Sequence, residues 1–197
     1  SPAVAHGKVY FGSGDGNVYA VDAATGVLQW KFPTKDVVHA SPAVVGNTVY
    51  IGSWDSFLYA LDAESGQPRW SFKSGEDPAI HNQVGFQSSS AVADGTVYVG
   101  SRDAHVYALD AATGRRKWDY PTSKSWVNGT PAVRDGVVYV GTSDSSRRVR
   151  APPSCGSARR ASLRCTTASS RSTPTATSVT SNAPPMRAMP APVRNSH

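Results

Sequence analysis

The chain has 197 residues, a hydrophobic fraction of 39% and a formal net charge of +6. This length allows one mid-sized domain, and no stretch is long and apolar enough to predict a membrane-spanning helix. Residues 1–146 hold eleven Lys and Arg against fourteen Asp and Glu, a net of −3, so the high pI does not indicate nucleic-acid binding by this part.

Four copies of one sequence phrase follow each other along the chain. A Ser-Pro-Ala-Val-like start occurs at residues 1, 41, 89 and 130, and each copy continues through a turn into Val-Tyr-x-Gly. An aspartate follows at a fixed offset: Asp15, Asp55, Asp103 and Asp144. Three copies then continue with Tyr-Ala-(Val/Leu)-Asp, a Gly turn and a tryptophan: Trp30, Trp70 and Trp118. A repeat of 40 to 48 residues indicates a solenoid, a propeller or an array.

Each copy is predicted to form four short strands. Val-Tyr-x-Gly and Tyr-Ala-Val-Asp alternate apolar with small or polar residues, as pleated strands do. Asp94-Gly95 and Asp135-Gly136 favour two-residue hairpin turns, and Gly26 is predicted to take a left-handed conformation in a longer one. The predicted fold is all-β, a partial β-propeller of about three and a half blades spanning 1–146. Its repeats are 1–40, 41–88, 89–129 and the partial 130–146.

A propeller of this kind closes with four to eight blades. Because Ser1 already lies inside a repeat, we expect a piece of a longer protein. Its open flanks are then covered by the remaining blades of the parent chain, or by a second copy.

Residues 147–197 have a different composition. They contain nine Arg, both Cys and both Met, but no Phe, Tyr, Trp, Asp, Glu or Lys. Such a segment buries too little apolar surface to offset the entropy of ordering, so a disordered tail is predicted. The switch in mid-repeat favours a reading-frame slip in a GC-rich gene; the alternatives are a genuine disordered tail and a tail that binds anions.

The phrase from Tyr107 to Trp118, with its copies at 19–30 and 59–70, resembles the pyrroloquinoline-quinone (PQQ)-like repeat. That resemblance implies a propeller in which the repeated tryptophan docks on the neighbouring blade. WD40 is the rival propeller family, but Trp54-Asp55 and Trp118-Asp119 fall at different points of the repeat and no Gly-His partner precedes them.

The PQQ-like family includes quinoprotein dehydrogenases that hold PQQ and Ca²⁺ on the propeller axis. It also includes a lipoprotein of the outer-membrane barrel assembly machine and sensor domains of bacterial Ser/Thr kinases. The enzymes carry adjacent cysteines near the cofactor and a calcium site with Glu, Asn and Asp. Because 1–146 contain no Cys and only Glu64 and Glu76, we expect no cofactor, with PQQ and calcium belonging only to the alternative of a dehydrogenase fragment.

Two groups of residues are candidates for binding. His39, Gln87 and Asn128 each lie two positions before an innermost strand, so by the family's topology they would converge on the mouth of the channel. Glu76 and His81 lie in an insertion between Trp70 and Ser89, and insertions in repeat arrays often map to the binding face. The aspartates that follow Val-Tyr-x-Gly are interpreted as turn caps. No catalytic or metal-binding set is predicted.

The sequence thus favours a non-catalytic module for protein interaction, scaffolding or ligand sensing, located in the periplasm or at the cell surface by family resemblance. We expect a protein partner and no nucleic acid for the repeats.

Overall fold

The computed structural model describes residues 1–75, 85–122, 126–143 and 146–150 of the chain. The regular structure of these residues consists of β-strands, which confirms the predicted all-β class. None of the described residues belongs to a helix that could span a lipid bilayer.

The strands form four antiparallel sheets, here called blades, and the strands of each blade are adjacent in chain order. Blade 1 contains β1 (Ala3–Ala5), β2 (Lys8–Gly12), β3 (Asn17–Asp22) and β4 (Leu28–Pro33). Blade 2 contains β5 (Ala43–Val45), β6 (Thr48–Gly52), β7 (Phe57–Asp62) and β8 (Pro68–Lys73). Blade 3 contains β9 (Ala91–Ala93), β10 (Thr96–Gly100), β11 (His105–Asp110) and β12 (Arg116–Pro121). Blade 4 contains β13 (Ala132–Arg134), β14 (Val137–Gly141) and β15 (Ser146–Arg150).

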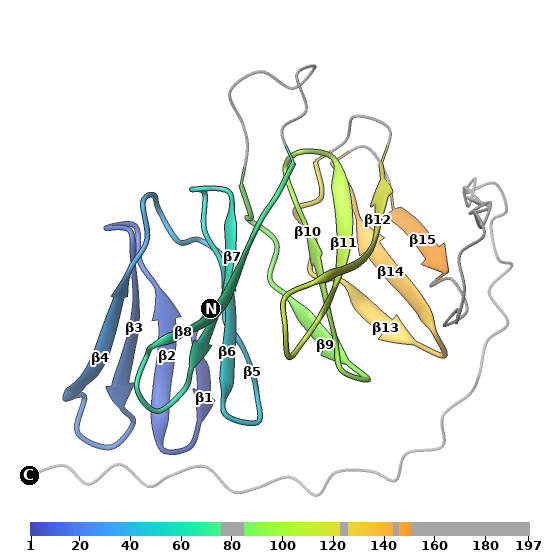
Figure 1. Ribbon diagram of the computed structural model, residues 1–197. Coiled ribbons are helices and arrows are strands. Elements are labelled where there is room, and N and C mark those ends of the chain that lie inside the picture. The colour runs from blue at the N-terminus through green and yellow to red at the C-terminus, as the bar shows by residue number, and fades with distance from the viewer. Residues whose placement is uncertain (76–84, 123–125, 144–145, 151–197) are drawn as a thin grey trace, which may run out of the picture.

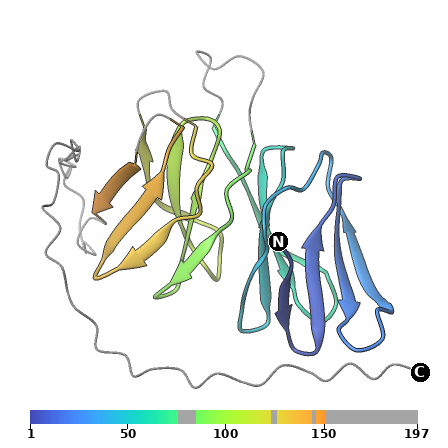
Figure 2. The same cartoon turned by 180° about the vertical axis from the view of Figure 1, so that it is seen from behind.

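The blades stand side by side, as Figures 1 and 2 show from opposite sides, and the first strands β1, β5, β9 and β13 contact one another. The amino group of Ser1 donates to Ser41 Oγ at 2.8 Å, and the Ser41 amide donates to Ser89 Oγ at 2.9 Å. The short first strands are therefore the inner strands, linked to one another by repeated serines. This arrangement is a partial β-propeller.

The turns match the local chemistry of the sequence. Asp94 and Gly95 have φ values of 48° and 65°, as a two-residue hairpin turn with positive φ at both positions requires. Gly26 has a φ of 72°, the left-handed conformation that glycine adopts without steric cost. The turn glycines of the sequence therefore mark hairpin ends correctly.

The core lies between the blades. Tyr10, Val18 and Trp30 of blade 1 pack with Val49 and Ile51 of blade 2. Equivalent residues of blades 2 and 3 form the next cluster, in which Leu58, Val97 and Leu109 are fully buried: Tyr50, Leu58, Ala60, Phe86, Val97, Val99, Tyr107 and Leu109. Because a single sheet cannot bury both of its faces, this packing makes each blade depend on its neighbours.

The structure extends the strand pattern beyond residue 146. Strand β15 pairs with β14 in antiparallel register, with Val138 opposite Val149 and Gly141 opposite Ser146. Sequence alone placed 147–150 in the tail because arginine is a poor signal for a strand. Backbone pairing in a hairpin does not require apolar side chains, so the strand can continue there. Residues 151–197 lie outside the described part of the chain.

Candidate functional site

The inter-blade linkers and the turns that follow the second strands lie at one end of the propeller, at the top of Figure 1. We call this the linker end. The described linker residues are 34–42, 74–75, 85–90, 122 and 126–131, and the turns of the complete blades are 13–16, 53–56 and 101–104. The opposite end carries the turns between the third and fourth strands.

In blades 1 to 3 the glycine of the Val-Tyr-x-Gly phrase makes room for a linker. A Cβ added at Gly52 would lie 2.3 Å from Phe86 Cβ, and one added at Gly100 would lie 2.2 Å from Val127 Cγ1. Phe86 and Val127 are fully buried. The glycine therefore allows one apolar linker residue to pack directly on the end of the second strand.

Each linker is hydrogen-bonded to the turns of two blades. The Phe86 amide donates to the Ser53 carbonyl of blade 2 at 2.9 Å, and the Gly85 carbonyl accepts from the Arg102 amide of blade 3 at 3.0 Å. The preceding linker makes the same pair of bonds, since the Trp54 amide donates to the Val37 carbonyl at 3.1 Å. These bonds fix the turn side chains relative to one another across blade boundaries.

A stack of aromatic and cationic side chains crosses the linker end. The Arg102 guanidinium lies 4.6 Å from the ring of Trp54 and 4.9 Å from the ring of Trp126. The His39 ring lies 5.2 Å from the Trp54 ring. Arg102 is only 6% exposed, and burial lowers the pKa of its guanidinium from the ordinary value. The faces of two tryptophans therefore stabilise a buried cation, an interaction worth about 0.5–2 kcal/mol per ring.

The residues predicted to surround the channel mouth lie at the linker end. His39, Gln87 and Asn128 occupy equivalent positions in three linkers and all three side chains are exposed. Among the described residues no side-chain hydrogen bond joins them to one another, and the His39 ring lies next to Trp54 of the stack. Glu76 and His81, the predicted insertion candidates, lie outside the described residues.

The repeated aspartates lie in the turns of the linker end. Asp15 Oδ1 accepts from the Asn17 amide at 3.1 Å and Asp15 Oδ2 accepts from the Tyr19 hydroxyl at 2.6 Å. The pKa of Asp15 is lowered to about 2, and the largest cause is the hydrogen bond from the Tyr19 hydroxyl. Asp55 and Asp103 bind the amide two residues on and the tyrosine hydroxyl four residues on in the same way. Asp144 lies outside the described residues.

These aspartates do not fit a calcium or PQQ site. Calcium prefers six to eight oxygen ligands that converge on one point. Here each carboxylate is engaged within its own turn, and the described part of the chain contains no group of three His, Cys, Asp or Glu side chains that could hold a metal. The described residues therefore do not supply the ligand set that quinoprotein chemistry needs.

The repeated tryptophans lie between blades. Trp30 Nε1 donates to the Ala63 carbonyl and Trp70 Nε1 to the Ala111 carbonyl, both at 3.0 Å and both on the next blade. The ring of Trp118 lies 5.9 Å from that of Tyr98, beside blade 4. The family resemblance implies docking of these tryptophans on the neighbouring blade. The Nε1 bonds of Trp30 and Trp70 cross to the next blade, and Trp118 packs against clusters that include Val138 and Val140 of blade 4.

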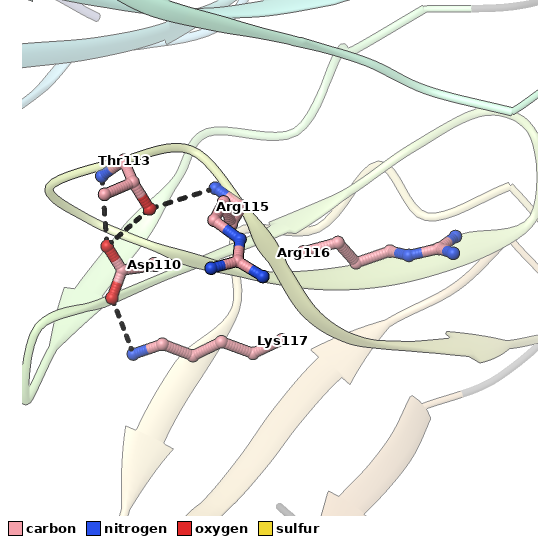
Figure 3. A pocket seen from close by; sticks show the side chains of 5 residues that line it. All are labelled: Asp110, Thr113, Arg115, Arg116 and Lys117. Atoms are coloured by element: carbon pink, nitrogen blue, oxygen red, sulfur yellow. Dashed lines mark hydrogen bonds and ion pairs between the residues drawn. The ribbon is translucent and has the colours of Figure 1, made fainter.

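A shallow polar hollow of about 350 Å³ lies at the opposite end, in the last hairpin turn of blade 3 (Figure 3). It is lined by Asp110, Thr113, Arg115, Arg116 and Lys117. Asp110 accepts from the Thr113 amide at 3.0 Å and lies 3.5 Å from Lys117 Nζ, while Arg116 pairs with Asp119. Asp110 therefore closes its own turn, and two of the cations that line the hollow have carboxylate partners.

Sequence reasoning missed the stack. Trp54 was noticed only as part of a Trp-Asp dipeptide, and Arg102 and Trp126 were not singled out. A signal existed, since Gly14, Trp54 and Arg102 occupy one variable position in an otherwise repeated Gly-Ser-x-Asp turn. Because the residue type at this turn position changes while its neighbours repeat, packing within the blade does not determine it, and the side chain is available for another role.

The sequence profile of one protein family, described as outer membrane protein assembly factor BamB, matches residues 1–85 and 79–152. The chain belongs to this BamB-like family of PQQ propeller repeats. The match ends at residue 152 and so includes strand β15, beyond the predicted boundary at 146. A search of curated proteins found no match to the chain.

Solved structures show the same fold as this BamB-like chain. BamB from Moraxella catarrhalis aligns with a TM-score of 0.60 and 22% identity, over 72% of this chain and 45% of that one. A quinohemoprotein alcohol dehydrogenase from Pseudomonas putida aligns with a TM-score of 0.64 and 24% identity, over 74% and 28%. The computationally designed Ika4 protein aligns with a TM-score of 0.65 and 20% identity, over 77% and 89%.

The BamB-like chain therefore spans less than half the length of the natural proteins it matches. At these identities the likeness establishes the propeller fold alone, and the aligned proteins include BamB, an alcohol dehydrogenase and a designed protein.

Proposed function

We propose that this chain is a non-catalytic PQQ-like propeller module that binds a protein partner through its linker end. The observation that carries the proposal is the stack of His39, Trp54, Arg102 and Trp126, which come from blades 2 and 3 and from the linkers on either side of them. Tryptophan and arginine are the residues most enriched at energetic centres of protein interfaces. A surface held by hydrogen bonds to rigid blades also loses little entropy when it binds.

The exposed polar residues complete such a surface. His39 presents its ring nitrogens 5.2 Å from the half-buried Trp54 ring, and Gln87 and Asn128 present exposed amides at the same end. Amide groups can donate to and accept from a partner's backbone, while the aromatic rings offer apolar area. We propose scaffolding or assembly as the role, in the periplasm or at the cell surface, in keeping with the description of the family as an assembly factor.

The second candidate is a fragment of a quinoprotein dehydrogenase. The likeness to an alcohol dehydrogenase supports its fold only, and the described carboxylates are engaged in turns. Residues outside the described part would have to supply the whole cofactor site, so the interaction module is the better supported of the two.

Site-specific photo-crosslinking in the native host tests the proposal. A photoreactive amino acid replaces His39, Gln87 or Asn128 at the linker end, and Ala24 or Ala112, which are exposed in turns at the opposite end, as matched controls. We expect one protein to be crosslinked from the linker-end positions and not from the controls. With that protein purified, His39→Ala should weaken binding by about 5-fold to 30-fold.

Equal crosslinking at the two ends would contradict the proposal, as would an unchanged affinity of the His39→Ala variant. Oxidation of a primary alcohol by the purified chain with added PQQ and Ca²⁺, detected with an artificial electron acceptor, would support the dehydrogenase alternative.

A further inference from the structure

The described part of the chain contains three asparagines, which differ in how their side chains are held. Asn17 Nδ2 donates to the Asp15 carbonyl at 3.1 Å, and Asn47 Nδ2 donates to Asp62 Oδ2 at 2.9 Å. Asn128 is exposed, and no hydrogen bond joins its side chain to another described residue. Of these three side chains, the Asn128 amide is therefore the one that can turn toward the backbone that follows it.

The residue that follows each asparagine differs as well. Val18 and Thr48 are β-branched and belong to strands β3 and β6, whereas Gly129 lies in a linker and has no side chain. A β-branched side chain crowds its own backbone, and a strand holds the amide nitrogen in an extended conformation. Glycine leaves its amide nitrogen open and reaches many backbone conformations. In the pair Asn128-Gly129 the side-chain amide carbon and the next backbone nitrogen can therefore meet.

The backbone of Gly129 is crowded but weakly bonded. A Cβ added there would lie 3.1 Å from the Gly141 nitrogen and oxygen, so packing against the end of β14 explains why the residue is glycine. The Gly129 amide donates to the Gly141 carbonyl at 3.4 Å, which is longer than the usual range of about 2.7–3.2 Å. A hydrogen bond of this length opens at little cost, which frees the nitrogen for reaction.

We propose that Asn128 is a modification site at which the side chain deamidates without an enzyme. The Gly129 nitrogen loses its proton to water and attacks Asn128 Cγ. The new C–N bond closes a succinimide ring, and the Cγ–Nδ2 bond breaks as the nitrogen leaves with a proton as ammonia. Water then adds to one of the two ring carbonyls and opens the ring, which gives aspartate or isoaspartate. No oxidant or reductant takes part.

The modification changes the linker end at the position of a candidate binding residue. A neutral amide becomes a carboxylate, and in isoaspartate the backbone gains a methylene group between Val127 and Gly129. Val127 packs on Gly100, and the Gly129 carbonyl accepts from Ser88 Oγ at 2.9 Å. Because the backbone is anchored on both sides of Asn128, the added charge and length are confined to this exposed segment. The consequence for binding rests on the proposed function.

Ageing of the purified full chain at mildly alkaline pH, followed by trypsin digestion and mass spectrometry, tests the proposal. Each described asparagine falls in its own tryptic peptide: 9–31, 36–69 and 125–134. A synthetic peptide of residues 126–131, which is too short to fold, gives the rate of the unrestrained Asn-Gly pair. Asn128→Gln is the control variant, because its longer side chain does not close the same ring.

We expect Asn128 in the folded chain to deamidate within about 10-fold of the rate of the free peptide, because a long hydrogen bond at Gly129 is its described restraint. Asn17 and Asn47 should react at least about 10-fold more slowly than Asn128, because their side-chain bonds must break first. An Asn128 that stays intact while the free peptide reacts completely would overturn the proposal. Equal rates at the three asparagines would also overturn it.

The same peptide distinguishes a second modification. Asn128-Gly129-Thr130 matches the acceptor pattern for N-glycosylation. A glycan on this peptide in protein purified from the native host would overturn the proposal, because the amide nitrogen would already be substituted.

Binding is measured separately, with the crosslinked partner and with protein before and after ageing. Lower affinity after ageing of the original chain, but not of Asn128→Gln, supports both the modification and the proposed function. Deamidation at Asn128 without any change in affinity supports the modification and counts against a binding role for this residue.

Discussion

Substitution of the glycine under a docking tryptophan measures how much the packing at that blade junction contributes to the free energy of unfolding. Gly66 and Gly26 share a φ of 72°, but a Cβ added at Gly66 would lie 2.6 to 2.9 Å from three ring atoms of Trp30, whereas one added at Gly26 has no neighbour within 4 Å. Alanine in the left-handed region costs about 1–2 kcal/mol at either position. Forcing a methyl group against a packed ring costs about 1–3 kcal/mol more. Gly66→Ala should therefore lower the free energy of unfolding by about 2–5 kcal/mol, and Gly26→Ala by about 1–2 kcal/mol.

Urea unfolding at 25 °C, followed by circular dichroism and by tryptophan fluorescence, measures both losses. The slope of the free energy against urea concentration should be the same for the two variants, since both unfold the same surface. Equal losses for Gly66→Ala and Gly26→Ala would refute the reasoning, because backbone conformation alone would then explain both. An equal effect would mean that the Trp30 ring moves aside freely.

Two further predictions concern the network around Asp103. The pKa of His105 is raised above 6.5. The largest cause is its interaction with Asp103, and the negative charge of Asp119 acts in the same direction. The stability from this ion pair is therefore complete below pH 6.5 and is lost as the pH rises through the raised pKa of the folded state. The free energy of unfolding measured in urea should fall by about 0.5–1 kcal/mol across that pH range. His105→Gln should remove this dependence on pH. Tyr107→Phe should cost about 1–3 kcal/mol in thermal and urea unfolding, because the hydroxyl donates to buried Asp103 and accepts from the Gly75 amide. A loss under 0.5 kcal/mol would indicate that water replaces the hydroxyl.

The sequence was sufficient to predict the propeller because its signals are local and repeated. Asp94-Gly95 specifies a hairpin turn within two residues, and Tyr107 and Trp118 keep a constant offset in three copies. Each repeat also packs against the next repeat in the same way, so the strands predicted for one blade apply to the neighbouring blades. The fourth blade was the exception, since strand β15 has no apolar alternation to mark it.

The linker-end stack could not be predicted in the same way. Trp54 and Arg102 are 48 positions apart, and Trp126 follows another 24 positions later. Their contact depends on how far each blade is rotated from the next, which no local pattern specifies. The repeat register gave His39, Gln87 and Asn128 equivalent positions, and the topology of the resembled family placed these positions at one end. The neighbour of His39 required the structure.

The anchored linkers have a consequence for how such a protein diversifies. The segment that enters blade 3 leaves blade 2 at Ser74, whose amide donates to the Ser56 carbonyl, and it is fixed again at Phe86 on Ser53. Both anchors belong to the blade 2 turn and are made by backbone atoms. A lineage could therefore lengthen, shorten or replace the residues between Gly75 and Gly85, which themselves bond to blade 3, while the blades on either side keep their packing. The same propeller can then acquire new specificity at one defined place, as antibodies do with loops of variable length on a constant framework.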